Sequence, residues 1–267
     1  MMSDRFWYQS MAPIQGLEHY RRALHSHAKQ ACASGVEVFF NGVDEERYRG
    51  RMPAEVHRYA YAKMLLQMDA IESGLRAQKE NFSAYILGSF SEPYLKETRS
   101  ALDIPVISLA EAALFTACSL AEQFALITLA PAYARRMRGV VQHHGVQSRM
   151  VGIFALTKER DEADVNAAFL APDEIISEFK TAARLAIAAG ADLVIPSEGL
   201  LSELLYENGV NTVDGATVLD SVGAALLKTE MLVNAKRRLG MGVSRSGAYA
   251  KAPDELLTQL RSDKRLL

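Results

Sequence analysis

Two short polar segments hold the residue types best suited to acid–base or nucleophilic chemistry. Each follows an apolar run expected to be a strand: residues 88–92 read Gly-Ser-Phe-Ser-Glu and residues 196–199 read Pro-Ser-Glu-Gly. The carboxylate of Glu198 can transfer protons. The hydroxyls of Ser89 and Ser197 can bind a carbonyl group or, beside a base, attack it. We therefore expect Glu198, Ser89 and Ser197 to be the catalytic residues.

Glu198 is the better proton-transfer candidate of the two acids beside these serines. An acid in a partly apolar pocket has its pKa raised by desolvation, toward the value that a general base needs near pH 7. Its alternative roles are a solvated loop carboxylate or an acid at the start of a helix over residues 199–206. Glu92 has the same two interpretations, and for it the loop role is favoured.

Further polar and small residues near the strand ends are expected to contact a substrate. They are Gln9, Ser10, Tyr48, Phe90, Ser91, Thr128 and Gly199. Ser10 and Thr128 can offer hydroxyl groups, beside backbone N–H groups, to a carboxylate, or they can cap helices. Tyr48 lies in a loop that we expect to close over the cleft.

Other chemistries lack the patterns that they require. No Gly-x-Ser-x-Gly elbow is present, and the pairs His25-x-His27 and His143-His144 lack the helical spacing of two metal ligands. The glycine-rich residues 240–247 follow a helix expected over 216–239 rather than a strand, so they do not match a dinucleotide-binding turn. We predict neither a metal site nor a cofactor.

Two further features receive structural interpretations. His57 is expected to be a partly exposed structural histidine. The basic run at residues 135–138 is expected to be solvated helix surface. Cys32 and Cys118, the two cysteines of the chain, are expected to pack as small hydrophobic residues.

The composition is that of an ordinary soluble globular protein. The 267 residues are 49% hydrophobic and 23% charged, and they allow one large α/β domain or two smaller ones. A net charge of −2 offers no overall attraction to nucleic acid or to a membrane, so a small molecule is the expected partner. Residues 1–7 contain no apolar signal segment, and the apolar stretch 109–129 is interrupted by polar residues. We expect a cytoplasmic protein.

Alternating strands and helices must position these residues. Short apolar runs predict eight strands in two sets of four: residues 6–11, 36–41, 84–87 and 106–108, then 124–129, 149–154, 192–195 and 212–214. Helical patterns between them favour parallel strands joined by crossover helices. The clearest helix spans 172–189, with acids at its start and Gly190 at its end.

An internal repeat divides the chain into two similar halves. The matched segments are 10–13 with 128–131, 85–89 with 193–197, and 104–107 with 210–213. Three pairs in the same order predict two flavodoxin-like, four-stranded parallel halves related by a pseudo-dyad, residues 1–109 with 215–267 and residues 110–214. Ligands bind outside the carboxyl ends of parallel strands, so Ser89 and Ser197 should line one cleft between the halves.

The same segments resemble the aspartate/glutamate/hydantoin racemase superfamily, most closely its hydantoin racemase branch. Residues 89–95 are similar to the family stretch Cys-Phe-Gly/Ser-Asp-Pro-x-Leu, and residues 195–200 are similar to Leu-Gly-Cys-Ala-Gly-Met. Matches to Pro-Val-x-x-x-x-Glu-Ala-Ala, Val-Ile-Asp-Gly and Ser-Lys/Arg-x-Gly-x-Tyr follow at residues 105–113, 212–215 and 244–249.

The resemblance implies two opposed cysteines as acid and base, but Ser89 and Ser197 stand at both positions. An alkyl hydroxyl without a partner base cannot act as a general base at pH 7. The expected function is therefore a cofactor-independent isomerase, lyase or hydrolase that uses Glu198 on a small carboxylate, cyclic amide or lactone. The alternatives are a catalytically silent ligand-binding or regulatory member and a racemase with non-cysteine bases. A homo-oligomer is compatible with each of them.

Overall fold

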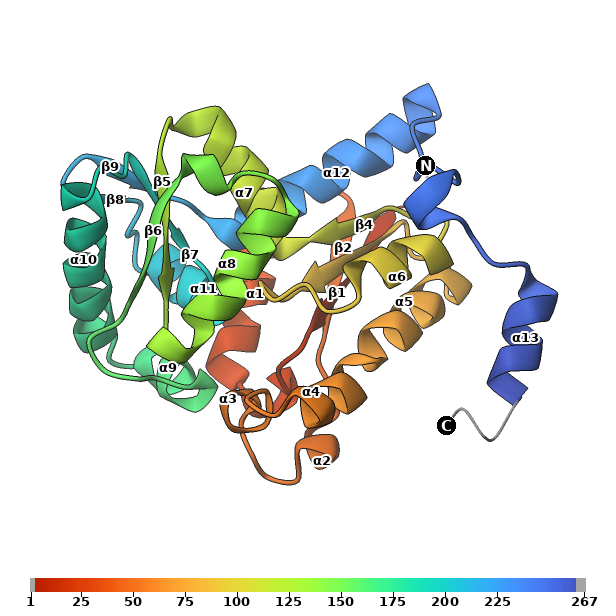
Figure 1. Ribbon diagram of the computed structural model, residues 1–267, viewed down its shortest axis with the longest axis horizontal. Helices are drawn as coiled ribbons and strands as arrows, with labels where there is room; N and C mark the ends of the chain where they lie inside the picture. Colours follow the sequence, from red (N-terminus) through yellow and green to blue (C-terminus); the bar gives the residue numbers. More distant parts are fainter. Residues whose placement is uncertain (1–2, 263–267) are drawn as a thin grey trace.

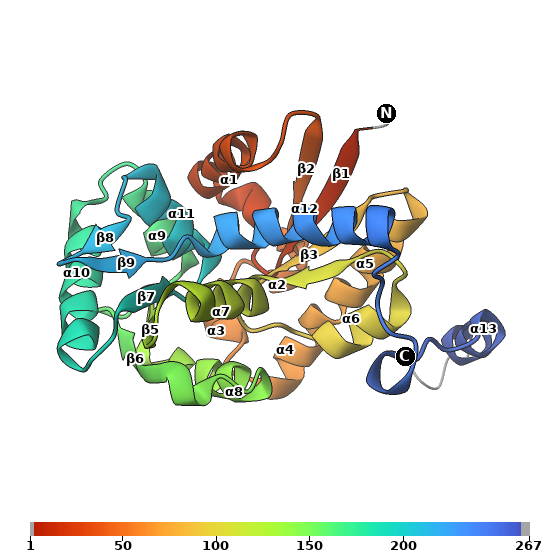
Figure 2. The same ribbon diagram turned by 90° about the horizontal axis from the view of Figure 1, so that it is seen from above.

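Two sheets organise the computed structural model, which describes residues 3–262 (Figures 1 and 2). The first sheet is parallel, in the order β2-β1-β3-β4, with β1 (Asp4–Ser10), β2 (Val36–Asn41), β3 (Ala84–Gly88) and β4 (Val106–Ser108). The second has the order β6-β5-β7-β9-β8, with β5 (Phe124–Thr128), β6 (Met150–Ala155), β7 (Leu193–Pro196), β8 (Thr212–Val213) and β9 (Ala216–Val218). The predicted α/β class with two similar halves is confirmed.

The second sheet has five strands rather than the predicted four. β8 is an antiparallel edge strand paired with β9, and β9 is the parallel neighbour of β7. Asp214 and Gly215, both at positive φ, connect β8 and β9 as the two-residue loop of a hairpin. The predicted parallel strand at 212–214 is therefore wrong, and so is the predicted helix start at residue 216. β9 also extends the second sheet past residue 214.

Helices cover both sheets, and their bounds are α1 (Glu18–Ala31), α2 (Glu45–Tyr48), α3 (Pro53–Val56), α4 (Ala60–Gln67), α5 (Asp69–Lys79), α6 (Leu95–Ala101), α7 (Leu109–Leu120), α8 (Ala134–His143), α9 (Glu162–Ala168), α10 (Asp173–Ala188), α11 (Gly199–Glu207), α12 (Ser221–Leu239) and α13 (Asp254–Ser262). The helix predicted over 172–189 is confirmed as α10, with Pro172 at its N-cap and Gly190 at positive φ after its end. No helix in the described part of the chain is long and apolar enough to cross a membrane.

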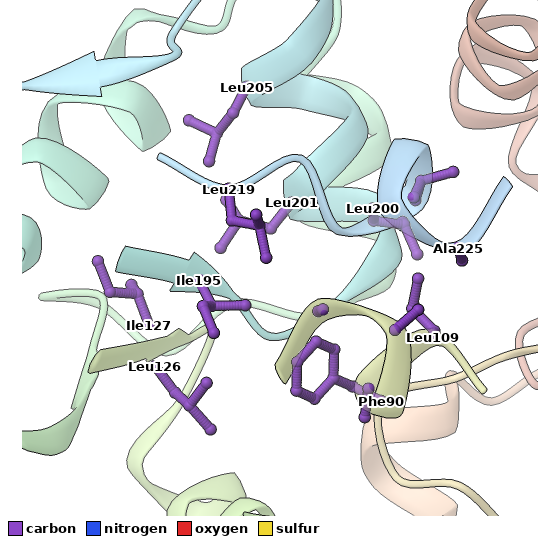
Figure 3. Packing of buried hydrophobic residues seen from close by; sticks show 14 of the residues in the cluster. Phe90, Leu109, Leu126, Ile127, Ile195, Leu200, Leu201, Leu205, Leu219 and Ala225 are labelled. Atoms are coloured by element: carbon purple, nitrogen blue, oxygen red, sulfur yellow. The ribbon is translucent and has the colours of Figure 1, made fainter. Parts of the chain in front are cut away.

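One hydrophobic cluster spans both halves, and a second, smaller cluster lies within the first half. The central strands β3, β5 and β7 are buried along their whole length, as expected for parallel strands covered on both faces. Figure 3 shows part of this core, in which Phe90 and Leu109 belong to the same cluster as Ile195 and Leu200. The strand ends that carry the polar segments are therefore held by a continuous packed scaffold.

A buried histidine on α1, the helix that follows β1, contacts acids from the segments that follow β7 and β9 of the second sheet. In His27 of α1, Nδ1 lies 2.7 Å from Oε1 of Glu203, and Nε2 lies 2.9 Å from Oδ2 of Asp220. Asp220 is the N-cap of α12, the helix that follows β9. Burial disfavours the imidazolium, but hydrogen bonds to Asp220 and Glu203 outweigh it and raise the pKa of His27 to about 9.

A matching arrangement joins the two halves in the opposite sense, through His144, which follows α8. Its Nε2 lies 2.8 Å from Oε2 of the buried Glu92, and Glu92 also accepts a hydrogen bond from Ser108, the N-cap of α7. In each case, a histidine near the helix that follows the first strand of one sheet contacts an acid located beyond the third strand of the other sheet. The internal repeat therefore extends to polar groups of low exposure. Glu92 lies in the loop between β3 and α6, as expected, but its side chain is largely buried against His144 and Ser108 rather than solvated.

Candidate active site

A cavity of about 90 Å³ lies where the carboxyl ends of β1, β3 and β7 meet. An engineered apolar cavity of about 150 Å³ accommodates benzene, so a cavity of this size suits a small, compact molecule. Its lining comes from both halves and consists of Ser10, Met11, Ala12, Tyr20, Pro53, His57, Gly88, Ser89, Phe90, Ser91, Leu129, Tyr133, Arg136, Met137, Glu162, Ser197, Glu198, Gly199 and Leu200. Ser89 and Ser197 thus line one cavity, as the sequence predicts.

The carboxylate of Glu198 is held by donors from the ends of two neighbouring strands. Thr128 Oγ1 donates to Oε1 over 2.6 Å, and Ser197 Oγ lies 3.3 Å from Oε2. Burial raises the pKa of Glu198 to about 7, against the opposing effect of hydrogen bonds from Thr128, the Leu129 backbone and Ser197; the charge of Glu162 raises it further. Both protonation states of Glu198 are therefore populated at neutral pH, as proton transfer requires.

The serines have different environments. Ser197 is fully buried, and its hydroxyl also lies within hydrogen-bonding distance of the Ile127 carbonyl, at 3.1 Å. The hydroxyl of Ser89 lies 3.0 Å from that of Ser91, and both line the cavity. Ser197 therefore supports Glu198 and its strand, whereas Ser89 and Ser91 present a pair of hydroxyls to a bound molecule.

Arg136 and Glu162 line the cavity, although the sequence did not identify either of them as a site residue. The basic run at 135–138 was expected to be solvated, but Arg136 lines the cavity and donates from Nη2 to the His57 carbonyl over 3.3 Å. Glu162, the first residue of α9, accepts from the Ala54 backbone N–H over 3.2 Å. Burial raises the pKa of Glu162. The run of basic residues at 135–138 could have indicated Arg136 as a site residue, whereas no sequence pattern indicated Glu162.

His57 also lines the cavity, which its structural interpretation did not anticipate. Burial, reinforced by the charges of Arg136 and Lys63, lowers the pKa of His57 to about 4. Its Nε2 lies 3.0 Å from the hydroxyl of Tyr48, and that hydroxyl donates to the Met11 carbonyl over 2.5 Å. A neutral imidazole with its Nε2–H donated to Tyr48 satisfies both contacts.

Three residues expected to bind substrate do not line the cavity. Tyr48 is buried in α2 behind His57 rather than in an open closing loop. Gln9 is buried beside Trp7, whose Nε1 donates to it over 3.1 Å. Thr128 is buried and contacts Glu198 instead of the cavity. The remaining expected residues, Ser10, Phe90, Ser91 and Gly199, do line it.

Comparison with known proteins identifies the family. The model of the Asp/Glu/Hydantoin racemase family matches residues 18–228. The chain belongs to this family. It is 25% identical over 206 residues to a hydantoin racemase from Paenarthrobacter aurescens, covering 73% of this chain and 79% of that protein. It is 26% identical over 144 residues to a hydantoin racemase from Pseudomonas sp. (strain NS671), and this match spans 54% of the chain and about half of that relative, 52%.

Solved structures of racemases share the fold. An allantoin racemase from Klebsiella pneumoniae superposes with a TM-score of 0.73 at 18% identity, covering 94% of each chain. An allantoin racemase from Pseudomonas fluorescens gives a TM-score of 0.66 at 18% identity, covering 93% of this chain and 97% of the other. The resemblance inferred from the segments around the two serines is confirmed at the level of the family by the family model.

Proposed function

We propose that this member of the family is a cofactor-independent enzyme that acts at the carbon next to a carbonyl group, with Glu198 as its proton-transfer group. The substrate class is a small carboxylate, cyclic amide or lactone. The observation that carries the proposal is the carboxylate of Glu198, with its pKa raised to about 7, in a cavity whose lining includes both serines and neither cysteine.

The proposed step begins with the carboxylate form of Glu198. It removes a proton from the carbon next to the carbonyl, and the electron pair of that C–H bond moves into the carbonyl group to form an enolate. The hydroxyls of Ser89 and Ser91 and the guanidinium of Arg136 are cavity groups that can stabilise the negative oxygen. Delivery of the proton from Glu198 to a different atom of the enolate completes an isomerisation, whereas its return to the same carbon after exchange with solvent gives hydrogen exchange alone.

The lining residues that come from the first half support a mechanism with a single proton-transfer group. Inversion by two bases needs a second group that accepts or donates a proton on the opposite face of the substrate. The titratable lining residues from that half are His57, whose pKa is lowered to about 4, and Tyr20, whose pKa is raised well above its ordinary value. Neither is matched to proton exchange near pH 7, and Glu162, the other carboxyl group of the lining, comes from the same half as Glu198.

The lyase and hydrolase alternatives use the same carboxylate. In a lyase step such as decarboxylation, carbon dioxide would leave the carbon next to the carbonyl, the electron pair of the broken C–C bond would form the enolate, and the protonated form of Glu198 would donate its proton to that carbon. In a hydrolase step it would activate water toward a ring amide or lactone. The names of the hydantoin racemase relatives support a cyclic amide, and the products of the reaction distinguish the three cases.

The test is proton exchange in deuterated water with small hydantoins, lactams, lactones and dicarboxylic acids. Glu198→Gln keeps the size of the side chain and removes the base, so kcat should fall about 10²–10⁴-fold with little change in KM. Glu122→Gln, at an exposed glutamate, is the matched control and should leave the rate unchanged.

The outcomes separate the candidates. Deuterium incorporation without inversion supports the one-base enzyme, and inversion of configuration would instead establish a racemase with non-cysteine bases. If Ser197→Ala abolishes turnover while Glu198→Gln does little, the roles assigned to the two residues are reversed. Tight binding of a compound with neither exchange nor turnover would identify a silent ligand-binding protein.

A further inference from the structure

The outer face of α4 is apolar and exposed. Tyr61, Met64, Leu65 and Met68 follow the i, i+3, i+4, i+7 spacing along the helix and its C-cap, and their exposed fractions are 70%, 40%, 45% and 43%. A stripe with this spacing normally faces a hydrophobic core. We call these four side chains the α4 stripe.

A basic hollow of about 350 Å³ adjoins the start of the α4 stripe. Its lining includes Arg49, Arg51 and Arg58, together with Tyr59 and one acid, Glu55. Within residues 3–262, none of these three arginines has a carboxylate within ion-pairing distance. The surface therefore combines unneutralised positive charge with an uncovered apolar face.

Helix α13 has the opposite chemistry. Figures 1 and 2 both show it standing away from the two sheets, and an ion pair between Arg261 and Glu72 links it to α5. Leu256 and Leu260, four residues apart on one face of the helix, are 45% and 47% exposed. An amphipathic helix of this kind is stabilised mainly by packing its apolar face against another surface.

The charges of the two elements are complementary. Asp254 and Glu255 form the first turn of α13, directly before its leucines, and neither has a basic partner among the described residues. In the receiving surface, Arg58 comes directly before α4, and Arg51 lines the same hollow from the segment before α3. An acidic turn followed by leucines therefore matches a basic hollow followed by apolar side chains.

We propose that α13 of one molecule docks on the α4 stripe and basic hollow of a second copy of this chain. The occupant is another copy because both figures show α13 and α4 apart, with α13 linked to α5 of its own chain. When each copy supplies one α13 and receives the other, the two contacts are identical and the assembly closes as a two-fold dimer.

The dimer contact lies close to the active-site cavity. The segment that carries Arg51 and Arg58 also carries Pro53 and His57, which line the cavity. Docking of α13 on the outer side of this segment therefore stabilises the wall of the site from outside. The proposed dimer does not depend on which reaction takes place in the cavity.

The first test measures the oligomeric state of the full chain by sedimentation velocity over a range of concentrations. Leu65→Glu and Leu260→Glu should each raise the dimer dissociation constant at least about tenfold, because each places a charge in an apolar contact. Leu170→Glu and Leu185→Glu change leucines that are 71% and 60% exposed elsewhere and should leave it unchanged. Circular dichroism confirms that each variant folds.

A charge exchange tests the pairing itself. The variant R51E/R58E and the variant D254K/E255K should each dimerise poorly, because their contacting charges are alike. Mixed together, they should form a heterodimer, since each α13 then meets a hollow of opposite charge. If the substitutions only weakened helix α13, mixing the two variants would not restore dimerisation.

Each remaining outcome overturns the proposal. A wild-type chain that stays monomeric at every concentration refutes it. So does a dimer that is indifferent to the stripe and α13 variants, or a mixture that forms no heterodimer. A monomer whose hydrodynamic radius grows in Leu65→Glu would mean that α13 docks on its own chain.

Discussion

The hydrogen bond from Thr128 to Glu198 makes a quantitative prediction that needs no substrate. Thr128→Val keeps the branched shape in the strand and removes the Oγ1 donor that lies 2.6 Å from Oε1 of Glu198. A hydrogen bond to a charged group contributes about 1.5–3 kcal/mol, and about 1.4 kcal/mol corresponds to one pKa unit. The pKa of Glu198 should therefore rise by about 1–2 units from its already raised value of about 7.

Two further substitutions near Glu198 should shift its pKa in directions that follow from their contacts. Ser197→Ala removes a longer contact of 3.3 Å and should raise the pKa of Glu198 by less than Thr128→Val does. Glu162→Gln removes a negative charge that raises the pKa of Glu198, so this variant should lower it. Opposite shifts at one carboxyl group distinguish these specific contacts from a general loosening of the cavity.

The assay is a pH titration of the glutamate side-chain carboxyl carbons by NMR on ¹³C-labelled protein. The Glu198 resonance is assigned by its loss in Glu198→Gln. A midpoint that is unchanged or lower in Thr128→Val would refute the reasoning, and so would a higher midpoint in Glu162→Gln. If Glu198 is the base, exchange activity falls as the pH drops through the same midpoint, because protonation removes the reactive carboxylate.

The remaining predictions concern packing and the thiols. A Cβ at Gly88 would lie 2.2 Å from the ring of the buried Tyr8, so Gly88→Ala should destabilise the fold by about 1–3 kcal/mol in urea unfolding. Gly139→Ala, on α8 with open space around it, should be neutral or stabilising and serves as the control. Changing both Cys32 and Cys118 to Ser should leave activity intact, since neither lines the cavity; rapid, substrate-protected inactivation by an alkylating reagent would contradict this.

Local patterns in the sequence determined most of the strands and the clearest helix. Buried parallel strands are short apolar runs, and helix α10 is marked by acids at its start and by Gly190 after its end, so neighbouring residues suffice to find them. The Asp214-Gly215 pair is also a local hairpin signal, and the sequence interpretation overlooked it. The motifs around Ser89 and Ser197 placed both serines at strand ends, and hence in one cavity.

Only the tertiary structure decided which side chains surround the reacting group. Thr128 and Glu198 are 70 residues apart, and their contact depends on the pairing of β5 with β7. Arg136 faces the cavity while the arginines beside it are exposed, because the packing of α8 fixes which side of the helix points inward. Desolvation of Glu198 likewise results from atoms contributed by distant segments, so its raised pKa is a property of the assembled cavity, whereas the sequence determined only that a carboxyl group stands there.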